Sequence, residues 1–562
     1  MKLAYSLIIF FFSMYTVGCG SSTRYKAHKP VPDDKATIPQ PAKNEINVIA
    51  DGFDNQVLEQ IEQSIDLSRQ LRNIFGKRKE AYNLDDFDEV ANSSWFVNRN
   101  FLKKMSVEEI FKGPDKGNGP DTSGVWTIIR AKSQGVTPGF QIRDSRGDKY
   151  VIKFDPKGYL EMLTGSEIVS TKLFFAAGYH TPENYRAYFR PEILELGENV
   201  KILGKKGTKR LMINSDLEDI LKKVEILPDG RILALASKYI EGELLGPFKY
   251  KGTRKDDPND IIPHQHRREL RGLRVIAAWL SHFDTKPGNS MASYVTVGNR
   301  SYVRHYLMDF GSTLGAGALA PVDPRIGSEN FFDPHAIFLN FISLGLYVKP
   351  WEKLKENEYH SIGNYESSLF RSEKFKFIVP NPAFENMTVR DGYWGAKIVM
   401  SFTDEQIKAA VASAEYSDPD AADFLTRTII ERRDIIGRYW FSKVNPLDKF
   451  EVIVDSSEAS FIGFSDLAIN GGLIHGEDSY YQIIIGNYEG IRYTKDVLKN
   501  KTYLKLPMFT SDNLSAEDAG NILVEIRTKR GSSGLWSKKV LVYLAYNPEL
   551  GEYKLLGIKR DT

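Results

Sequence analysis

Three short groups of residues, in a fixed order along the chain, could together act on a phosphate. The first ends in Lys153 (Val151-Ile152-Lys153), the second is the run 282–289 (His-Phe-Asp-Thr-Lys-Pro-Gly-Asn), and the third is Asp309-Phe310-Gly311. Phosphoryl transfer requires a protein mainly to position the reacting groups and to neutralise phosphate charge. Divalent cations such as Mg²⁺ prefer hard oxygen ligands, which Asp309 and Asn289 offer. Asp284 offers a carboxylate that could accept the proton of an attacking hydroxyl.

The order and local setting of these groups resemble the protein kinase-like superfamily. Run 282–289 is similar to the kinase catalytic loop at His, Asp, Lys, Pro and Asn, and the Asp-Phe-Gly matches the kinase metal-binding motif letter for letter. The resemblance implies that ATP, or another nucleoside triphosphate, binds with Mg²⁺ or Mn²⁺. It implies Asp284 as the catalytic base, Lys286 as a charge on the γ-phosphate, and Asn289 and Asp309 as the metal ligands.

The same resemblance implies that Lys153 holds the α- and β-phosphates and is oriented by an acidic residue on the following helix. Glu167 is the expected partner because it lies inside the predicted helix 165–177. Glu161 is the alternative, since it precedes Thr164-Gly165 and is less suited to a helical position.

Two further segments fall where a kinase would contact its nucleotide. Gly135 and Gly139, between the first two predicted strands, could let backbone N–H groups approach phosphate, although the usual three-glycine spacing is absent. A plain hairpin turn is the alternative. Lys238 and Glu241 lie in Ser237-Lys238-Tyr239-Ile240-Glu241-Gly242, where a kinase hinge would present its backbone to adenine. An ordinary strand end explains that segment equally well.

The chain also departs from the protein kinase pattern. Phe283 stands where many protein kinases carry an Arg that pairs with a phosphorylated activation loop, so such regulation is not expected. No Ala-Pro-Glu follows Gly311 at the usual place, which disfavours the peptide-substrate platform. His282-x-Asp284 with Pro287-Gly288-Asn289 is also similar to aminoglycoside phosphotransferases, which act on small molecules. The acceptor therefore stays open between protein, glycan, lipid and small molecule.

The elements that must position these residues follow from hydrophobic periodicity. An antiparallel meander and a helix are predicted before the hinge segment, and two longer helices and a β-rich region after it. The predicted strands are 125–130, 140–143, 150–154 and 233–240, with a hairpin tip at Gly298-Asn299, and the predicted helices are 57–74, 165–177, 267–281 and 424–441. Together these predict an α+β chain with a bilobal kinase-like core.

The 562 residues predict several domains. We expect a signal peptide over 1–18, a flexible tether over 19–43, an N-terminal, mainly helical extension over 44–124, a kinase-like domain over 125–445 and a C-terminal domain over 446–562. Trp95, Phe96 and Phe101 are expected to pack the extension against a neighbouring domain. Short Val-, Ile- and Tyr-rich strands separated by turn residues predict that the C-terminal domain is a β-sandwich of roughly seven strands. Its partner could be a protein or a glycan.

Charge and cysteine content bear on partners and location. Lys plus Arg is 75 and Asp plus Glu is 73, a net charge of +2 that gives no reason to expect nucleic acid as a partner. The single cysteine, Cys19, excludes a disulfide framework within one chain. It follows a short apolar run (Leu7 to Phe12) and Val17-Gly18, which resembles a bacterial lipoprotein signal with Cys19 as the lipidated residue. An ordinary cleaved signal with a chance cysteine is the alternative.

These features predict a membrane-anchored atypical kinase, facing the periplasm or the cell surface, with the outer membrane weakly favoured by Gly20. The alternative is a non-catalytic surface lipoprotein that uses the kinase-like fold and the β-rich domain for binding, because little ATP is expected outside the inner membrane. Two other groups of residues carry ionisable side chains. His264-Gln265-His266 suggests a solvated helix cap rather than a metal site, and Arg267, Arg268, Arg271 and Arg274 form either a solvated face or a contact with acidic residues inside the fold.

Overall fold

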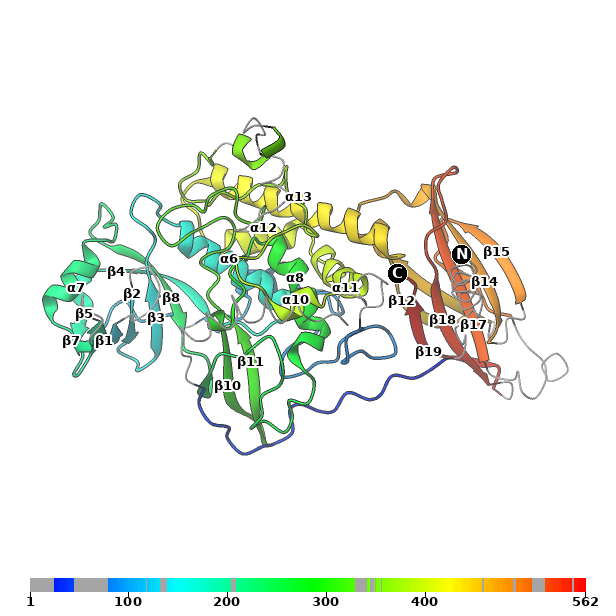
Figure 1. Cartoon of the computed structure of the whole chain (residues 1–562), viewed down its shortest axis with the longest axis horizontal. Helices are drawn as coiled ribbons and strands as arrows, with labels where there is room; N and C mark the ends of the chain where they lie inside the picture. The colour runs from blue at the N-terminus through cyan, green and yellow to red at the C-terminus, as the bar shows by residue number, and fades with distance from the viewer. Residues whose placement is uncertain are drawn as a thin grey trace, which may run out of the picture. The chain divides into compact units, whose positions relative to one another are not determined.

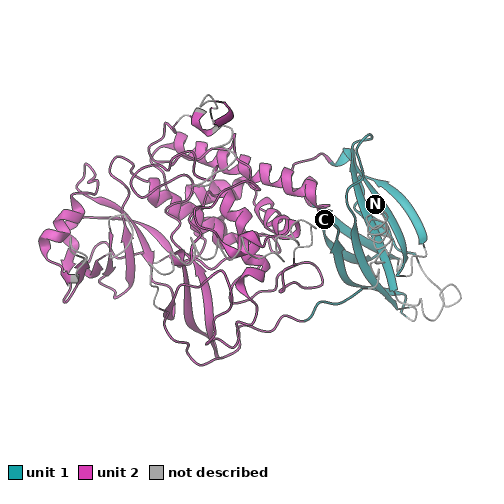
Figure 2. Ribbon diagram, in the orientation of Figure 1, with its two compact units in different colours: residues 1–29, 447–466, 476–561 teal, residues 30–446, 467–475, 562 magenta. Residues whose placement is uncertain are grey.

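The computed structural model of the chain describes residues 25–44, 79–117, 119–131, 139–203, 209–328, 341–343, 348, 350–354, 356–456, 459–488, 492–507, 521–547 and 550–562. It divides into two compact units, which Figure 2 shows in two colours. Unit 1 comprises residues 1–29, 447–466 and 476–561, and unit 2 comprises residues 30–446, 467–475 and 562. The predicted helix 57–74, Cys19 and Gly135 lie outside the described residues.

A six-stranded sheet forms one part of unit 2 (Figure 1). Its order is β4-β8-β3-β2-β1-β5, and all neighbours are antiparallel except β1 and β5. The strands are β1 (Trp126–Ala131), β2 (Gly139–Arg143), β3 (Lys149–Lys153), β4 (Asn184–Phe189), β5 (Leu194–Leu196) and β8 (Ile232–Lys238). The four strands expected in this region are therefore present. Alternation puts Phe140, Ile142, Tyr150 and Ile152 into one core, against which α7 (Asn214–Leu221) packs. A separate pair, β6 (Lys201–Leu203) and β7 (Lys209–Leu211), lies between β5 and α7 in the sequence.

Helix α6 (Met162–Ala177) follows β3 and is buried along almost its whole length. It begins three residues before the predicted Gly165 because Asp155, in the preceding loop, accepts hydrogen bonds from the backbone N–H groups of Leu163 (2.7 Å) and Thr164 (2.9 Å). These bonds satisfy donors that have no partner inside a helix. Gly178 ends the helix, as expected, at a φ of +120°. A helix buried on this many sides holds its side chains in fixed positions.

The remaining helices of unit 2 share one large core with α6. Capping boxes begin three of them, formed by Ser106 and Glu109, by Thr388 and Asp391, and by Thr403 and Gln406. The helices are α5 (Val107–Lys112), α8 (Arg268–Trp279), α10 (Pro382–Glu385), α11 (Val389–Met400), α12 (Asp404–Ala412), α13 (Pro419–Lys443) and α14 (Leu467–Asn470), with 3-10 turns at Pro191–Ile193, His264–His266, Pro287–Asn289 and Pro350–Lys353. Among the described residues, no helix is both long and apolar enough to span a bilayer.

Arg268 and Arg271 of α8 are buried against acidic residues inside the fold, as is Arg267 before it, so a solvated basic face is wrong for these three; Arg274 is half-buried. Arg268 is fully buried with Nε 2.6 Å from Oδ1 of Asp391, and Arg271 lies 3.2 Å from Oδ2 of the same carboxylate. The expected solvated cap at His264 is also wrong, because His264 is buried and its Nε2 lies 2.7 Å from Asp260. Charges this deep in a fold are tolerated only when they are paired.

Residues 87–101 pack into unit 2. Trp95 stacks on His305 at 3.5 Å between ring centroids, and Phe96 contacts the rings of Tyr179 and Trp394. Phe101 is buried in the same core. The described part of the predicted N-terminal extension therefore belongs to the same compact unit as the sheet and the helices.

A three-stranded sheet, β11-β10-β9, completes unit 2. Its strands are β9 (Glu243–Gly246), β10 (Ser290–Val297) and β11 (Arg300–Leu307). The hairpin expected at Gly298-Asn299 is confirmed, with Gly298 at a φ of +61° that suits glycine. This hairpin separates the 282–289 loop from the Asp-Phe-Gly.

Unit 1 is β-rich, as the sequence predicts. It contains a sheet of order β12-β13-β16 and a second of order β15-β14-β17-β18-β19, all antiparallel. The strands are β12 (Leu447–Val454), β13 (Ser460–Asp466), β14 (Ser479–Asn487), β15 (Arg492–Lys499), β16 (Tyr503–Lys505), β17 (Asn521–Arg530), β18 (Val540–Asn547) and β19 (Glu552–Arg560), with a 3-10 turn at Gly476–Asp478. Apolar residues from both sheets form one core, and alternate residues of β14 and β17 point into it.

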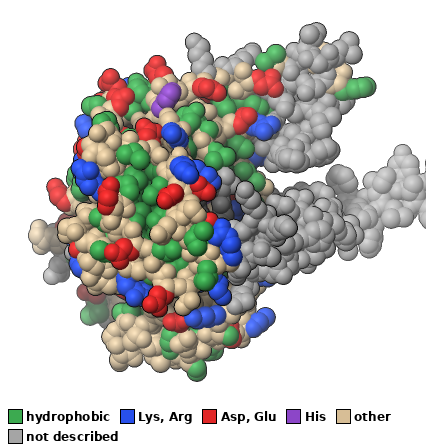
Figure 3. Space-filling view, turned by 90° about the vertical axis from the view of Figure 1, so that its left-hand side faces the viewer, with side chains coloured by type: hydrophobic (Ala, Val, Ile, Leu, Met, Phe, Trp, Pro, Cys, Tyr) green, Lys and Arg blue, Asp and Glu red, His purple; other side chains and the backbone are tan. Residues whose placement is uncertain are grey.

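The surface carries no large field of one sign on the face seen in Figure 3. Basic and acidic side chains are interspersed over its coloured part. This mixture agrees with the near-zero net charge of the sequence.

Candidate active site

The side chain of Lys153 is the centre of an ion cluster that joins three elements of unit 2. Its Nζ lies 3.1 Å from Oε2 of Glu167 on α6 and 2.7 Å from Oδ1 of Asp309, which follows β11. Glu161 lies elsewhere, where it contacts Arg186 and accepts hydrogen bonds from Ser417. Of the two carboxylates considered from the sequence, the fold therefore places Glu167 against Lys153.

The electrostatics of this cluster are set by burial and by opposite charges. The Glu167 side chain is 1% exposed and that of Lys153 is 11%, whereas that of Asp309 is 51% exposed. Burial alone would lower the pKa of Lys153, but the charges of Asp309 and Glu167 outweigh it and raise the pKa. Burial raises the pKa of Glu167, and the charge of Lys153 opposes that rise. Lys153 is thus held as a cation with one partly solvated carboxylate partner.

Glu167 also fixes the Asp-Phe-Gly backbone. Its Oε1 accepts a hydrogen bond of 3.0 Å from the N–H of Phe310. The Phe310 ring is fully buried, 4.7 Å from the ring of Phe174 on α6 and 5.5 Å from that of His282. One helix therefore positions Lys153, the Asp309-Phe310 backbone and the imidazole that opens the 282–289 loop.

Asp309 itself adopts a left-handed backbone conformation, with a φ of +64°. Asp tolerates this region better than most residues, yet it is uncommon outside glycine. The bond to Lys153 and the anchored Phe310 on its C-terminal side hold the residue there. Sparsely populated backbone conformations of this kind are concentrated at functional sites.

The 282–289 loop folds around the carboxylate of Asp284. Lys286 Nζ lies 2.7 Å from Asp284 Oδ2, and the Asn289 amide donates to the Asp284 carbonyl (2.8 Å) and to Oδ2 (3.2 Å). Because Nδ2 of Asn289 is directed at Asp284, its amide oxygen is directed away from that carboxylate. His282 is buried, and this burial lowers its pKa to about 4, so its imidazole is neutral at pH 7.

Closure of the β10–β11 hairpin brings Asn289 and Asp309 together although they are far apart in sequence. Ser290 pairs with Leu307, and the N–H of Met308 donates to the carbonyl of Asn289 at 3.1 Å. The residues that flank this hairpin are therefore adjacent whatever its length. The interval between the two motifs is thus taken up by the hairpin.

A divalent cation fits the oxygen donors that this closure supplies. The Asp309 carboxylate is half-exposed, and the Asn289 amide oxygen is directed away from Asp284. Among the described residues no three His, Cys, Asp or Glu side chains converge as a metal cage. A cation held by one carboxylate and one amide would take its other ligands from water and phosphate, as Mg²⁺ commonly does.

Lys238 and Glu241 do not lie with this cluster. Lys238 pairs in register with Tyr150, whose side chain faces the sheet core, whereas Lys153 faces the other way. The Lys238 ammonium lies 3.0 Å from Asp148, and the exposed Glu241 side chain pairs with Lys116. Their backbones are also engaged, since Lys238 N–H donates to Glu183 (2.9 Å) and Ser293 donates to the Glu241 carbonyl (2.5 Å).

The structure explains why position 139 is a glycine, which the sequence alone does not. It pairs with Lys153 between β2 and β3, and a Cβ at this position would lie 2.3 Å from the carbonyl oxygen of Ile152. The glycine therefore permits close strand approach beside Lys153, and its proposed contact with phosphate remains a prediction.

Two side chains on the same face as Lys153 were not singled out from the sequence. Gln141 pairs with Val151, two residues before Lys153, so all three share one face of the sheet. Gln141 accepts a hydrogen bond from the hydroxyl of Tyr239. Because alternate residues of a strand share a face, the sequence alone could have placed Val151 with Lys153. Gln141 could not be placed there, because that requires the pairing register of β2 with β3.

Comparison with known proteins gives solved structures only. No family model and no curated protein matches the chain. It is similar to a Helicobacter pylori proinflammatory kinase, CtkA, with 13% identity over 57% of this chain and 96% of that one, at a TM-score of 0.28. It is also similar to the Golgi casein kinase, with 11% identity over 74% of this chain and 96% of that one, at a TM-score of 0.26.

A second structure of the Golgi casein kinase, with Mn/ADP bound, matches at 12% identity over 74% of this chain and 93% of that one, at a TM-score of 0.26. The structural neighbours of this chain are thus kinase-like. At these TM-scores the likeness carries no argument about the site, which stands on its own geometry.

Proposed function

We propose that this chain is a kinase that transfers the γ-phosphoryl group of a nucleoside triphosphate to a hydroxyl acceptor. The observation that carries the proposal is the cluster in which Lys153 contacts Glu167 and Asp309, together with the hairpin that bonds Asn289 to Met308, the residue before Asp309. In this assignment Lys153 binds the α- and β-phosphates, and Asn289 and Asp309 hold Mg²⁺ or Mn²⁺. The bound cation would neutralise phosphate charge as the bond to the leaving oxygen breaks.

Asp284 is assigned as the base. Its carboxylate accepts hydrogen bonds from Lys286 and Asn289, which orient it and leave its other oxygen for the acceptor hydroxyl. As the acceptor oxygen forms its bond to the γ-phosphorus, the hydroxyl proton passes to Asp284 and the nucleoside diphosphate leaves. Lys286 is assigned to balance charge on the transferred group.

The kinase interpretation extends to architecture. We interpret the six-stranded sheet with α6 as the smaller lobe and the helices around α8, α11 and α13 as the larger lobe of a kinase-like core. We interpret the two sheets of unit 1 as a β-sandwich. What supports the lobes is that the sheet has a core of its own, while the helices share another core, to which α6 contributes from beside the sheet. What supports the sandwich is that the two sheets of unit 1 share one core.

A thermal-shift measurement with ATP and Mg²⁺ or Mn²⁺ tests the proposal. Ligand at 100 times its dissociation constant should stabilise the wild-type chain by ~2.7 kcal/mol. Asp309→Ala should lose most of this shift, whereas Asp219→Ala, which removes an exposed carboxylate paired with Lys222 on α7, should retain it. The absence of a shift in the wild type would refute nucleotide binding.

Phosphate transfer is measured in parallel with γ-labelled ATP and a membrane extract as the source of acceptors. Labelled product is expected with the wild type and not with Asp309→Ala. A thermal shift without transfer would replace the kinase by the non-catalytic binding protein that the sequence left as the alternative.

We also propose that Cys19 carries a lipid that anchors the chain to a bacterial membrane. The support is the sequence pattern around Cys19. Cys19→Ser should move the chain from the membrane fraction to the soluble fraction, and fractionation of the two membranes of the cell should place the wild type in one of them. Membrane association unchanged by Cys19→Ser would refute the anchor.

A further inference from the structure

A cavity of about 650 Å³ lies in unit 2, and it is distinct from the candidate active site. Its walls come from the turn 324–328, from residues 351–354, 356–359 and 364–375, and from α13, and Ser281 also lines it. Lys153, Asp284 and Asp309 are not among the residues that line it. Small-molecule pockets commonly have volumes of about 300–1,000 Å³, so this cavity can take one.

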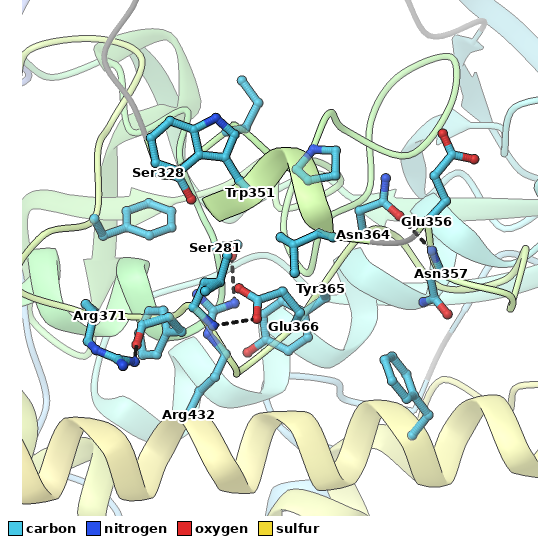
Figure 4. Close-up of a pocket in the computed structure, with 18 of the residues that line it drawn as sticks. Ser281, Ser328, Trp351, Glu356, Asn357, Asn364, Tyr365, Glu366, Arg371 and Arg432 are labelled. Carbon is cyan, nitrogen blue, oxygen red and sulfur yellow. Dashed lines mark hydrogen bonds between the residues drawn. The ribbon is translucent and has the colours of Figure 1, made fainter. Parts of the chain in front are cut away.

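Aromatic rings and branched aliphatic groups form a large part of the cavity walls. Ile326, Trp351, Tyr359, Phe375 and Phe424 all line it. Figure 4 shows Trp351 and Tyr365 on either side of the space, above helix α13. Such a lining favours a flat apolar body, because aromatic rings bind through offset or edge contacts.

Arg432 of α13 is a cation at the floor of the cavity. It is 3% exposed, and its guanidinium lies 3.7 Å from the ring centroid of Phe370 and 4.4 Å from that of Tyr365. It donates to Oγ of Ser281 at 2.8 Å, a bond drawn in Figure 4, and to the carbonyl of Ala278 at 3.1 Å. Among the described residues its Nε has no hydrogen-bond partner.

Burial leaves the Arg432 charge poorly compensated. It lowers the pKa of Arg432, and the nearby Glu366 and Tyr365 only partly oppose this effect. The carboxylate of Glu366 already accepts hydrogen bonds from Ser368 (2.6 Å) and from the N–H of Leu369 (2.8 Å). A cation in such a low-dielectric setting acts strongly on any charge placed beside it.

Of the other charges of the lining, Glu366 is half-buried and four are exposed to solvent. Glu356 and Glu358 are exposed, as are Arg371 and Lys374, so water screens all four and their signs cancel. Arg432 is therefore the least exposed charge of the lining, and the Glu366 carboxylate beside it is already hydrogen-bonded to Ser368 and Leu369.

Rigid support makes this a built site. The hydroxyl of Tyr365 donates to the carbonyl of Trp279 at 2.6 Å, and Arg432 holds Ala278 and Ser281 in the same turn. Asn364 is fixed by bonds to Asn357 (3.1 Å) and to the carbonyl of Val322 (2.9 Å). The walls do not need to form around a ligand, which lowers the entropy lost on binding.

We propose that this cavity binds a small organic anion with an aromatic body, its ring against Trp351 and Phe424 and its anionic group toward Arg432. The site is separate from the nucleotide site, and the proposal stands whether or not the chain is a kinase.

The test is isothermal titration calorimetry of the full chain with 2-naphthoate, compared with 2-naphthalenemethanol, which keeps the ring and lacks the charge. We expect one site per chain and an affinity for 2-naphthoate at least tenfold higher. Equal affinity for the two ligands, or no binding of 2-naphthoate, would overturn the proposal.

Variants locate the binding. Leu369→Trp fills the cavity from its wall and should abolish binding of both ligands, whereas Ile378→Trp, at a 52% exposed position outside the lining, should leave both unchanged. Arg432→Gln should reduce 2-naphthoate to the affinity of the alcohol. If Arg432→Gln does not fold, the Leu369 and Ile378 pair still decides, since wild-type affinity in Leu369→Trp would place the ligand elsewhere.

Discussion

Removal of the Lys153 charge should expose how much of the fold depends on the ion cluster. Lys153→Met leaves Glu167, whose side chain is 1% exposed, without its cation. Loss of one partner of a buried ion pair costs about 3–5 kcal/mol. The Asp309 side chain is 51% exposed, so solvent screens its share of the interaction. We therefore expect the free energy of unfolding to fall by ~3 kcal/mol at pH 8, the lower end of that range.

The loss should depend on pH in a defined direction. Burial raises the pKa of Glu167, and Lys153 is the charge that opposes this rise. In Lys153→Met the pKa of Glu167 in the folded chain rises further above its pKa in the unfolded chain. At pH values above the unfolded-chain pKa, the buried and ionised Glu167 therefore lowers the stability of the fold. Stability relative to wild type should be lowest at pH 8 and should recover as the pH falls toward 5.5 and Glu167 takes up a proton.

Urea unfolding followed by tryptophan fluorescence is the assay. Six of the seven Trp residues lie in unit 2 and only Trp536 lies in unit 1, so the signal reports mainly on the unit that holds the cluster. The control is Lys238→Met, which removes an ammonium 3.0 Å from the partly exposed Asp148 and should cost less than ~1 kcal/mol.

A double variant separates charge from packing. In Lys153→Met/Glu167→Gln the Gln oxygen can still accept the N–H of Phe310, and no unpaired charge is buried. At least half of the lost stability should return, without the pH dependence. If the double variant is as unstable as Lys153→Met at pH 8, or if the loss is the same at pH 5.5, the reasoning from a buried charge pair is refuted.

Three further predictions concern the loop and the core. Asp284→Asn should keep nucleotide binding and lower turnover by about 100-fold or more in a γ-labelled ATP assay, and equal loss of both would show that Asp284 is not the base. His282 has a pKa lowered to about 4 by burial, so unfolding takes up a proton below pH ~6.5 and stability is lost as the pH falls toward 4. His282→Phe should remove ~2–3 kcal/mol of that loss at pH 4.5 in urea unfolding, and an unchanged pH profile would contradict the assignment. Asp391→Ala leaves the buried Arg268 and Arg271 without their shared carboxylate and should cost at least ~3 kcal/mol, whereas a thermal unfolding midpoint close to wild type would show that the pair is not buried.

Local pattern was enough for the elements and for the chemistry-bearing motifs. The strands around Phe140 and Val151, the helix that carries Glu167 and the β-rich region after Pro446 all occur where periodicity predicts them. These features depend on residues two to four positions apart, so the alternation of a strand or the spacing of a helix can be seen directly in the sequence. For the same reason the choice of Glu167 over Glu161 could be made from helix position alone.

Contacts between distant segments could not be obtained this way. Nothing near Arg268 in the sequence shows that Asp391 lies against it, so a basic helix face suited a solvated position equally well. Lys238 lies in the predicted hinge segment, yet strand register turns its side chain to the face opposite Lys153. A shift of one residue in pairing would reverse that result, and register depends on the whole sheet.

The sequence by itself determined which residues can do chemistry, in what order they occur, and on which elements they lie. Only the tertiary structure decided that Lys153 contacts both Glu167 and Asp309, that the β10–β11 hairpin bonds Asn289 to Met308 beside Asp309, and that α13 buries Arg432 at a cavity separate from the candidate active site. The physical reason is that side-chain type and spacing are local, whereas burial, ion pairing and cavities arise where segments far apart in the chain pack together.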